Sequence, residues 1–170
     1  MSPHPILLIG GSGVVGRWAS RFLRDAHPDT PLLIGGRDAA RAEEAAAGFG
    51  NAEGVAIDLA REDLGLGERR VGAVAVLFTD ERVAGLRFAQ TRGVPHISIS
   101  RGINEIGPEV AAYMHAPDAA PVVLGTEWLV GATTVAALEF ARAFGRVPSA
   151  KRRPESWRRG WSRCPALKAA

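Results

Sequence analysis

Six consecutive residues near the amino terminus have the types and spacing of a phosphate-binding turn. They follow a short apolar run and open a helical pattern, and three are glycines: Gly11, Ser12, Gly13, Val14, Val15 and Gly16. Gly11 permits a tight turn, Gly13 lets the backbone approach a diphosphate, and Gly16 lets the helix pack closely. The first amides of the helix then face an anion, and the Ser12 hydroxyl adds a donor. We predict a turn that binds a dinucleotide diphosphate; the alternative is a turn that binds nothing.

The end of the second predicted strand bears on the choice of dinucleotide. Proteins that prefer NAD usually place an acid there, which accepts hydrogen bonds from the ribose. This chain has Gly36 followed by Arg37. A small residue leaves room for a 2′-phosphate and a guanidinium pairs well with it, which favours NADP over NAD. Asp38 keeps NAD open, because it either caps the next helix or serves the ribose. FAD fits less well, since its ribose is also usually held by an acid here.

Other polar side chains are placed near the turn by topology alone. Asp58 ends the third predicted strand, where it either lies near an adenine or closes a turn. Thr79 follows the fourth strand, in the loop expected to pass under the cofactor. Ser98 and Ser100 end the fifth, on the expected nicotinamide side. Arg17 follows the last glycine and either contacts phosphate or points to solvent. No residue is identified as a general acid or base.

Short apolar runs alternate with helical patterns along the chain. The pattern predicts strands at 6–9, 32–34, 55–57, 71–78, 96–99 and 121–124, helices at 14–23, 39–49, 81–91, 103–113 and 133–144, and helical turns within 60–66. Val15, Trp18, Ala19 and Phe22 share one face of the first helix. Asp38 and Asp80 are placed as helix caps. Strands buried on both faces indicate a doubly wound α/β fold of Rossmann type, with six parallel strands ordered 3-2-1-4-5-6.

Charge divides the chain into two parts. Residues 146–170 hold eight basic residues and one acid, a net charge of +7, whereas the first 145 residues hold 13 arginines, no lysine and 17 acids, a net charge of −4. We therefore predict a dinucleotide-binding domain at 1–145. The tail at 146–170 has no helical or strand period, and we expect it to be disordered or loosely packed. Because the high pI belongs to the tail, a role in binding nucleic acid is not inferred from it.

Several classes of protein are disfavoured by what the sequence lacks. The four histidines and single cysteine have no metal-ligand spacing, and the Walker phosphate-binding pattern is absent. The only tyrosine, Tyr113, is followed four residues later by Pro117, so a Tyr-x-x-x-Lys pair is missing. No apolar run is long enough for a membrane span or a signal peptide. We expect a cytoplasmic protein with a small-molecule substrate of unknown identity, and we allow for a homodimer.

The sequence resembles the cofactor-binding domain of the saccharopine dehydrogenase-like oxidoreductases over residues 5–145. The resemblance is carried by Ile6 to Arg17, by Gly36-Arg37, by Asp58, and by a Gly-x-x-Trp-x-x-Gly segment at 125–131. Glu127 and Val130 depart from the family, which tends to have glycine and proline there. That family continues into a substrate domain. We hypothesise that the tail is truncated or out-of-frame coding sequence where that domain should begin.

The resemblance implies an NAD(P)-dependent oxidoreductase, or its cofactor domain, that transfers hydride through a nicotinamide. Two other hypotheses remain. The first is a dinucleotide-binding module without turnover. The second is an interaction protein whose basic tail binds nucleic acid or an acidic membrane; a solvated tail accounts for the same charges.

Overall fold

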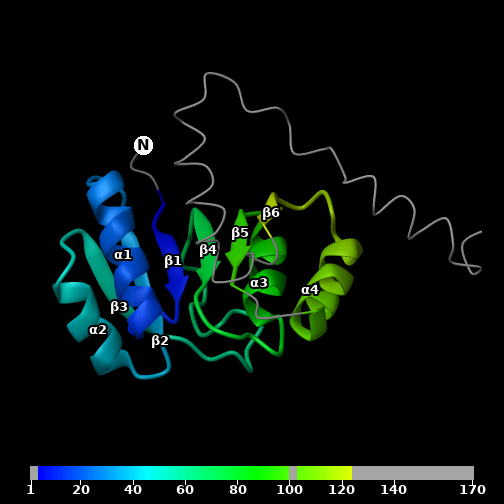
Figure 1. The fold of residues 1–170 in the computed structure, drawn as a ribbon, viewed down its shortest axis with the longest axis horizontal. Coiled ribbons are helices and arrows are strands. Elements are labelled where there is room, and N and C mark those ends of the chain that lie inside the picture. Colours follow the sequence, from blue (N-terminus) through cyan, green and yellow to red (C-terminus); the bar gives the residue numbers. More distant parts are fainter. Residues whose placement is uncertain (1–3, 100–102, 124–170) are drawn as a thin grey trace, which may run out of the picture. The chain divides into compact units, whose positions relative to one another are not determined.

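The computed structural model describes residues 4–99 and 103–123, all within one compact unit, Met1–Ala132. Six parallel strands form one sheet in the order β3-β2-β1-β4-β5-β6, which confirms the predicted fold class (Figure 1). The strands are β1 (Ile6–Ile9), β2 (Leu32–Gly36), β3 (Ala52–Ala56), β4 (Ala73–Val76), β5 (His96–Ser98) and β6 (Val122–Val123). The helices are α1 (Val14–Ala26), α2 (Ala39–Ala47), α3 (Ala84–Arg92) and α4 (Ile103–His115). Ser100, the 125–131 segment, the predicted helix at 133–144 and the tail lie outside the described residues.

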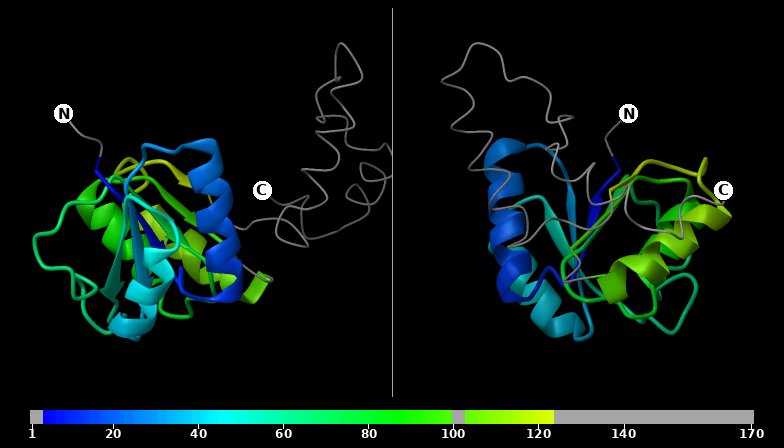
Figure 2. Two further views of the ribbon diagram at one scale, coloured as in Figure 1. Left: turned by 90° about the vertical axis from the view of Figure 1, so that its left-hand side faces the viewer. Right: turned by 45° about the vertical axis from the view of Figure 1, so that its right-hand side comes forward.

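The sheet is covered by helices on both sides (Figure 2). Alternate residues of β1 point to opposite faces: Leu7 and Ile9 join the core beneath α3, whereas Leu8 joins the core beneath α2. This two-sided burial explains why the central strands read as continuous apolar runs. No helix in the described ranges is long and apolar enough to cross a membrane.

Helix α1 is rotated from the orientation that its apolar pattern predicts. Gly16 and Ser20 face the sheet and are buried, whereas Val15, Trp18 and Phe22 are exposed. The Ser20 hydroxyl donates to the Gly16 carbonyl within the helix. The rotation has a steric cause, because a β-carbon on Gly16 would lie 2.2 Å from the Gly10 carbonyl oxygen. The side of α1 that contacts the glycine turn must therefore be the one without a side chain.

Two predictions for the chain between β2 and β4 are wrong: the start of β3 and the helical turns at 60–66. Strand β3 begins at Ala52 and not at 55, and it pairs with β2 along its length. Residues 60–66 form turns and bends in place of helical turns. The Asp63 carboxylate is the reason, since it accepts from the Gly65 and Gly67 amides and pairs with the Arg61 guanidinium. These bonds favour a compact loop over a helix.

Helix α3 also begins later than the sequence indicates, at Ala84 in place of 81. The Asp80 carboxylate accepts from the Arg82 amide at 3.2 Å and the Gly85 amide at 2.8 Å. The N-cap of α3 is therefore Val83, in a left-handed conformation, and not Asp80, although the Asp80 carboxylate still binds an amide of the first turn. The bond to the Gly85 amide ties the first turn of α3 to the loop that connects β4 to α3. This loop follows the carboxyl end of β4.

Candidate functional site

The predicted site residues all follow the carboxyl ends of strands. In the strand register, Ile9 pairs with Gly35 on one side and with Val76 on the other, so β1, β2 and β4 end at one level. We call this edge of the sheet the carboxyl edge. The chain leaves β1 toward β2 on one side, and β4 lies on the other. This is the switch point at which open α/β sheets bind ligands.

The glycine turn connects β1 to α1 and is held against β2. The Gly10 and Gly11 amides both donate to the Gly35 carbonyl, at 2.9 and 3.1 Å, and the Gly13 amide donates to the Gly10 carbonyl at 3.0 Å. Gly10 has a φ of +85°, a left-handed conformation that favours glycine. A β-carbon on Gly11 would lie 2.8 Å from the Leu8 carbonyl oxygen. The protein's own packing therefore requires glycine at three positions, 10, 11 and 16.

Gly13 differs from the other glycines of the turn. It is the N-cap of α1, with extended backbone angles of φ −80° and ψ 176° that any residue adopts. A β-carbon there would meet one atom, the Gly10 carbonyl oxygen at 3.3 Å, so the protein restricts this position least. The missing side chain leaves the backbone open at the mouth of the turn.

The amino terminus of α1 has no anionic partner within the described residues. Its N-cap makes no side-chain hydrogen bond, and its first turn holds no acid. The amides of Val14, Val15 and Gly16 have no acceptor among residues 4–99 and 103–123. Three unpaired amides and the positive end of the helix dipole can stabilise a diphosphate at this point.

Ser12 lies between the turn and the end of β2. A β-carbon on Gly36 would be 2.8 Å from the Ser12 hydroxyl oxygen, so glycine at 36 makes room for that hydroxyl. The Arg17 Nε donates to the Ser12 carbonyl at 3.2 Å. Arg37, the next residue after Gly36, is exposed. The structure thus gathers Gly11 to Gly16 and Gly36-Arg37 at one place.

Asp38 and Asp58 each accept a hydrogen bond from a backbone amide two or three residues further along the chain. The Asp38 carboxylate caps α2 by accepting from the Arg41 amide at 3.1 Å. The Asp58 carboxylate accepts from the Ala60 amide at 2.9 Å, as a turn acid does. Asp58 reaches the carboxyl edge because the Ile57 amide donates to the Gly36 carbonyl at 2.7 Å. Each acid keeps one oxygen without a partner in the described chain.

The β4–β1 side of the turn is closed by an aromatic residue that the sequence analysis did not single out. The Phe78 ring lies 3.1 Å from the position of a β-carbon on Gly10. Thr79 follows it and is half-buried in the same loop. The signal was present in the sequence: a large apolar residue at the end of the predicted strand 71–78, which neighbours β1.

Ser98 pairs in register with Val76 and so ends β5 at the carboxyl edge, two strands from β1, whereas the buried His96 and Glu109 lie at the start of β5 and on α4. His96 and Ser98 are buried on β5, and Glu109 on α4; the His96 Nδ1, Ser98 Oγ and Glu109 Oε2 atoms have no hydrogen-bond partner in the described chain. Burial lowers the pKa of His96 to about 4, against the opposing charge of Asp80. The Arg61 guanidinium and the Gly65 amide hold the pKa of Asp63 well below its ordinary value.

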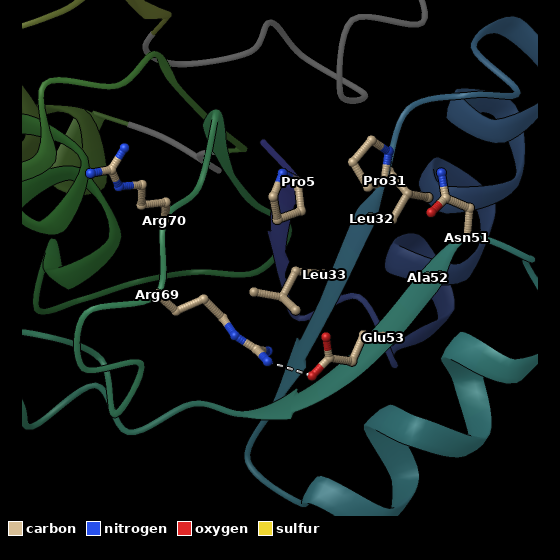
Figure 3. Close-up of a pocket in the computed structure, with 9 residues that line it drawn as sticks. All are labelled: Pro5, Pro31, Leu32, Leu33, Asn51, Ala52, Glu53, Arg69 and Arg70. Carbon is tan, nitrogen blue, oxygen red and sulfur yellow. Dashed lines mark hydrogen bonds and ion pairs between the residues drawn. The ribbon is translucent and has the colours of Figure 1, made fainter. Parts of the chain in front are cut away.

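A cavity of about 420 Å³ lies at the opposite edge of the sheet (Figure 3). It is lined by residues that precede or begin β1, β2 and β3, among them Pro5, Pro31 and Asn51. Arg69 extends toward Glu53 and pairs with it at 2.6 Å, whereas the Arg70 guanidinium points away. Of the two arginines that line the cavity, Arg69 is neutralised by Glu53 and Arg70 points out of it. The cavity also lies at the edge opposite the glycine turn, so the glycine turn is the better candidate site.

Comparison with known proteins places the fold. No family model matches the sequence, and no curated protein matches it. Among solved structures, it is similar to a myo-inositol dehydrogenase from Corynebacterium glutamicum, with a TM-score of 0.60 and 24% identity over 83% of this chain and 41% of that one. A dTDP-glucose 4,6-dehydratase from Bacillus anthracis, in complex with NAD, gives 0.54 and 11% over 70% and 53%.

A third similar structure is an oxidoreductase of the short-chain dehydrogenase/reductase family from Burkholderia thailandensis. Its TM-score is 0.53, with 16% identity over 81% of this chain and 74% of that one. This chain spans 41% and 53% of the length of the first two structures. Identities this low establish architecture and not activity. The chain is therefore an α/β protein of Rossmann type, the fold that these dehydrogenases and dehydratases share.

Proposed function

We propose that the glycine turn binds a nicotinamide dinucleotide, with NADP preferred over NAD, and that the chain is the cofactor-binding part of an oxidoreductase. The observation that carries the proposal is the mouth of the turn. Gly13 lacks a side chain where the protein's own packing demands it least, and three helix amides beside it have no acceptor in the described chain. A diphosphate bound there accounts for both features.

The residues present fit such a cofactor. Val14, Val15 and Gly16 offer amides to the diphosphate, and Ser12 offers a hydroxyl beside the space left by Gly36. Arg37 is placed for a 2′-phosphate, and Asp58 and Thr79 border the same edge. When bound, a nicotinamide supplies hydride at its C4 atom. The protein's part is to hold the dinucleotide and to orient the ring.

The preference for NADP rests on the end of β2. An acid that accepts from the ribose hydroxyls is absent at Gly36, and the carboxylate of Asp38 is turned to the Arg41 amide. A hydrogen bond to a charged group contributes about 1.5 to 3 kcal/mol, equal to about ten- to a hundredfold in affinity. Arg37 therefore supplies enough to select a 2′-phosphate over a hydroxyl.

Calorimetric titration of the full chain with NADPH and NADH tests the proposal. We expect Arg37→Ala to weaken NADPH about ten- to a hundredfold and to leave NADH unchanged. Arg70→Ala is the matched control, because it removes one exposed guanidinium at the opposite edge. Absence of binding by either dinucleotide would refute the proposal.

The finer assignment is to the saccharopine dehydrogenase-like group, and it rests on the sequence resemblance. The Gly-x-x-Trp-x-x-Gly segment that discriminates this group lies outside the described residues. Hydride transfer from NADPH to a panel of imine and keto acid substrates, followed by cofactor absorbance, tests it. Turnover of carbonyls alone, with no imine reduced, would count against this group.

A binding module without turnover is the second candidate, and one observation favours it. Within the described ranges, the carboxyl edge carries no histidine, lysine, cysteine or tyrosine. These are frequent general acids and bases, and the buried His96 lies at the start of β5. Dinucleotide binding with no hydride transfer to any substrate of the panel would support this candidate.

A further inference from the structure

We propose that Arg17 is a second cation for the 2′-phosphate and that it also positions Ser12 for the same group. The inference rests on the proposed function and deepens it, because it states how selectivity is divided at the ribose end. Three features carry it: the side of α1 on which Arg17 lies, its contact with Ser12, and the lack of a carboxylate partner in the described chain.

Arg17 lies on the side of α1 that faces α2 and β3. Arg24 is seven residues further along, about two helical turns, and so shares that side. The Arg24 guanidinium donates to the Phe49 carbonyl just beyond α2 and to the Asn51 carbonyl just before β3. Arg17 is on the same side but at the carboxyl end of the sheet, where β2 ends and Gly36-Arg37 follows.

Ser12 links Arg17 to the end of β2. The Arg17 Nε donates to the Ser12 carbonyl, and the Ser12 hydroxyl occupies the space that Gly36 leaves. Ser12 therefore contacts Arg17 through its carbonyl and the end of β2, which precedes Arg37, through its hydroxyl. The Nε bond uses one of the five donors of the guanidinium, which leaves its terminal nitrogens for a ligand.

The charge around Ser12 is unbalanced. The ion pairs of the described residues join Arg61 to Asp63 and Arg69 to Glu53, and neither involves Arg17 or Arg37. The carboxylate of Asp38, the nearest acid in sequence to Arg37, accepts from the Arg41 amide as the cap of α2 and forms no ion pair with Arg37 in the described chain. Arg17 bonds the Ser12 carbonyl and Arg37 follows Gly36, so both cations belong to the two segments that meet at the Ser12 hydroxyl. Two such cations suit a phosphate dianion, whereas a ribose hydroxyl would gain little from either.

The cofactor offers two phosphate sources, the 2′-phosphate and the diphosphate, and they can be separated with four probes. NADPH and 2′,5′-ADP carry the 2′-phosphate, whereas NADH and 5′-ADP do not. We expect Arg17→Gln to weaken NADPH and 2′,5′-ADP about tenfold and to leave NADH and 5′-ADP within about twofold. Arg21→Gln is the control, since Arg21 lies one turn further from the amino terminus of the same helix and its guanidinium packs over the Trp18 ring.

A lysine variant separates charge from positioning. Arg17→Lys keeps the cation but loses the planar fork that holds the Ser12 carbonyl. It should recover part of the lost NADPH affinity, and its thermal unfolding should match that of Arg17→Gln.

The outcomes distinguish the two proposals. If NADPH and NADH weaken equally in Arg17→Gln, or if neither changes, Arg17 is not a 2′-phosphate ligand and only this inference fails. If the unaltered chain binds none of the four probes, the proposed function fails as well.

Discussion

The two edges of the sheet treat their backbone groups in opposite ways. At the opposite edge, which we call the amino edge, the guanidinium of Arg24 donates to five backbone carbonyls, those of His27, Pro28, Thr30, Phe49 and Asn51. At the carboxyl edge, Arg17 meets one carbonyl, and three amides of α1 have no acceptor in the described chain. Arginines on the same side of one helix thus have different surroundings: Arg24 satisfies the backbone carbonyls of the amino edge, whereas the amides near Arg17 stay free to bind an anion.

Substitution of Gly16 should disrupt the carboxyl edge more than any other change. Gly16→Ala places a methyl group 2.2 Å from the Gly10 carbonyl oxygen and 2.5 Å from the Gly11 Cα, and neither atom belongs to a side chain that could move away. We expect the free energy of unfolding to fall by about 3 kcal/mol or more and NADPH binding to be lost. Urea unfolding and calorimetry measure the two effects.

Gly48→Ala is the control for this substitution, because Gly48 is the C-cap of α2 with a φ of −77°, and a β-carbon there would make only an ordinary contact, 3.6 Å from the Ala45 carbonyl oxygen. Alanine there should leave stability unchanged or raise it by up to about 1 kcal/mol. A stable Gly16→Ala protein that still binds NADPH would show that the turn is not packed as described.

Substitution of Arg24 should disrupt the amino edge. Arg24→Ala removes all five hydrogen bonds to carbonyls at once, and we expect the free energy of unfolding to fall by about 3 kcal/mol. NADPH affinity, measured below the unfolding transition, should hardly change. Arg21→Ala, one turn away and exposed, should shift stability by no more than about 0.5 kcal/mol. A loss of NADPH affinity in Arg24→Ala alone would mean that the two edges are coupled.

The stability of the protein should fall at acidic pH because His96 is buried on β5. The pKa of His96 is about 4 in the folded chain, lowered by burial, against 6.5 for the exposed side chain. The unfolded chain therefore binds the proton first, so stability is complete above pH 6.5 and falls as pH drops toward 4. We expect a loss of about 3 kcal/mol across that window, measured by urea unfolding.

His96→Gln provides the control for this pH dependence, since glutamine does not titrate. The variant should flatten the stability profile between pH 6.5 and 4. Asp63, whose pKa is lowered by Arg61 and Gly65, loses its contribution only at more acidic pH. An unchanged profile in His96→Gln would assign the acid sensitivity to another group.

The smallest effect sharpens the assignment of Asp38. Asp38→Ala removes the cap of α2 and should cost about 1 kcal/mol of stability. The ratio of NADPH to NADH affinity should stay constant, because the carboxylate serves the Arg41 amide. A selective loss of NADH binding in competition calorimetry would instead make Asp38 a ribose ligand, as the sequence alone allowed.

The strand order and the turn were predictable because their signals are local. Continuous apolar runs mark buried strands, and three glycines at fixed spacing mark the turn. Strand β3 was placed three residues late because its first residues, Ala52, Glu53 and Gly54, lack an apolar run. Its position depends on contact with α2: a β-carbon on Gly54 would lie 2.2 Å from the Glu43 amide nitrogen. A close approach of this kind is not visible in sequence patterns.

The orientation of side chains was less predictable than the position of elements. The apolar residues of α1 predicted a core face, yet Trp18 and Phe22 stack on each other at the surface, with ring centroids 5.7 Å apart. Hydrophobic periodicity reports a face but not its partner, and backbone contact at Gly16 determines the rotation. In the same way, the sequence offered two roles for Asp38, and the hydrogen bond to Arg41 favours the cap.

The contact between Gly36 and the Ser12 hydroxyl makes two positions, distant in sequence, interdependent. Any side chain at 36 requires that hydroxyl to rotate away or to be removed. An acidic residue therefore cannot be introduced at 36 without disturbing the glycine turn. Redesign of nucleotide preference in this chain has to treat positions 12 and 36 as a pair, whose combined effect will differ from the sum of the single changes.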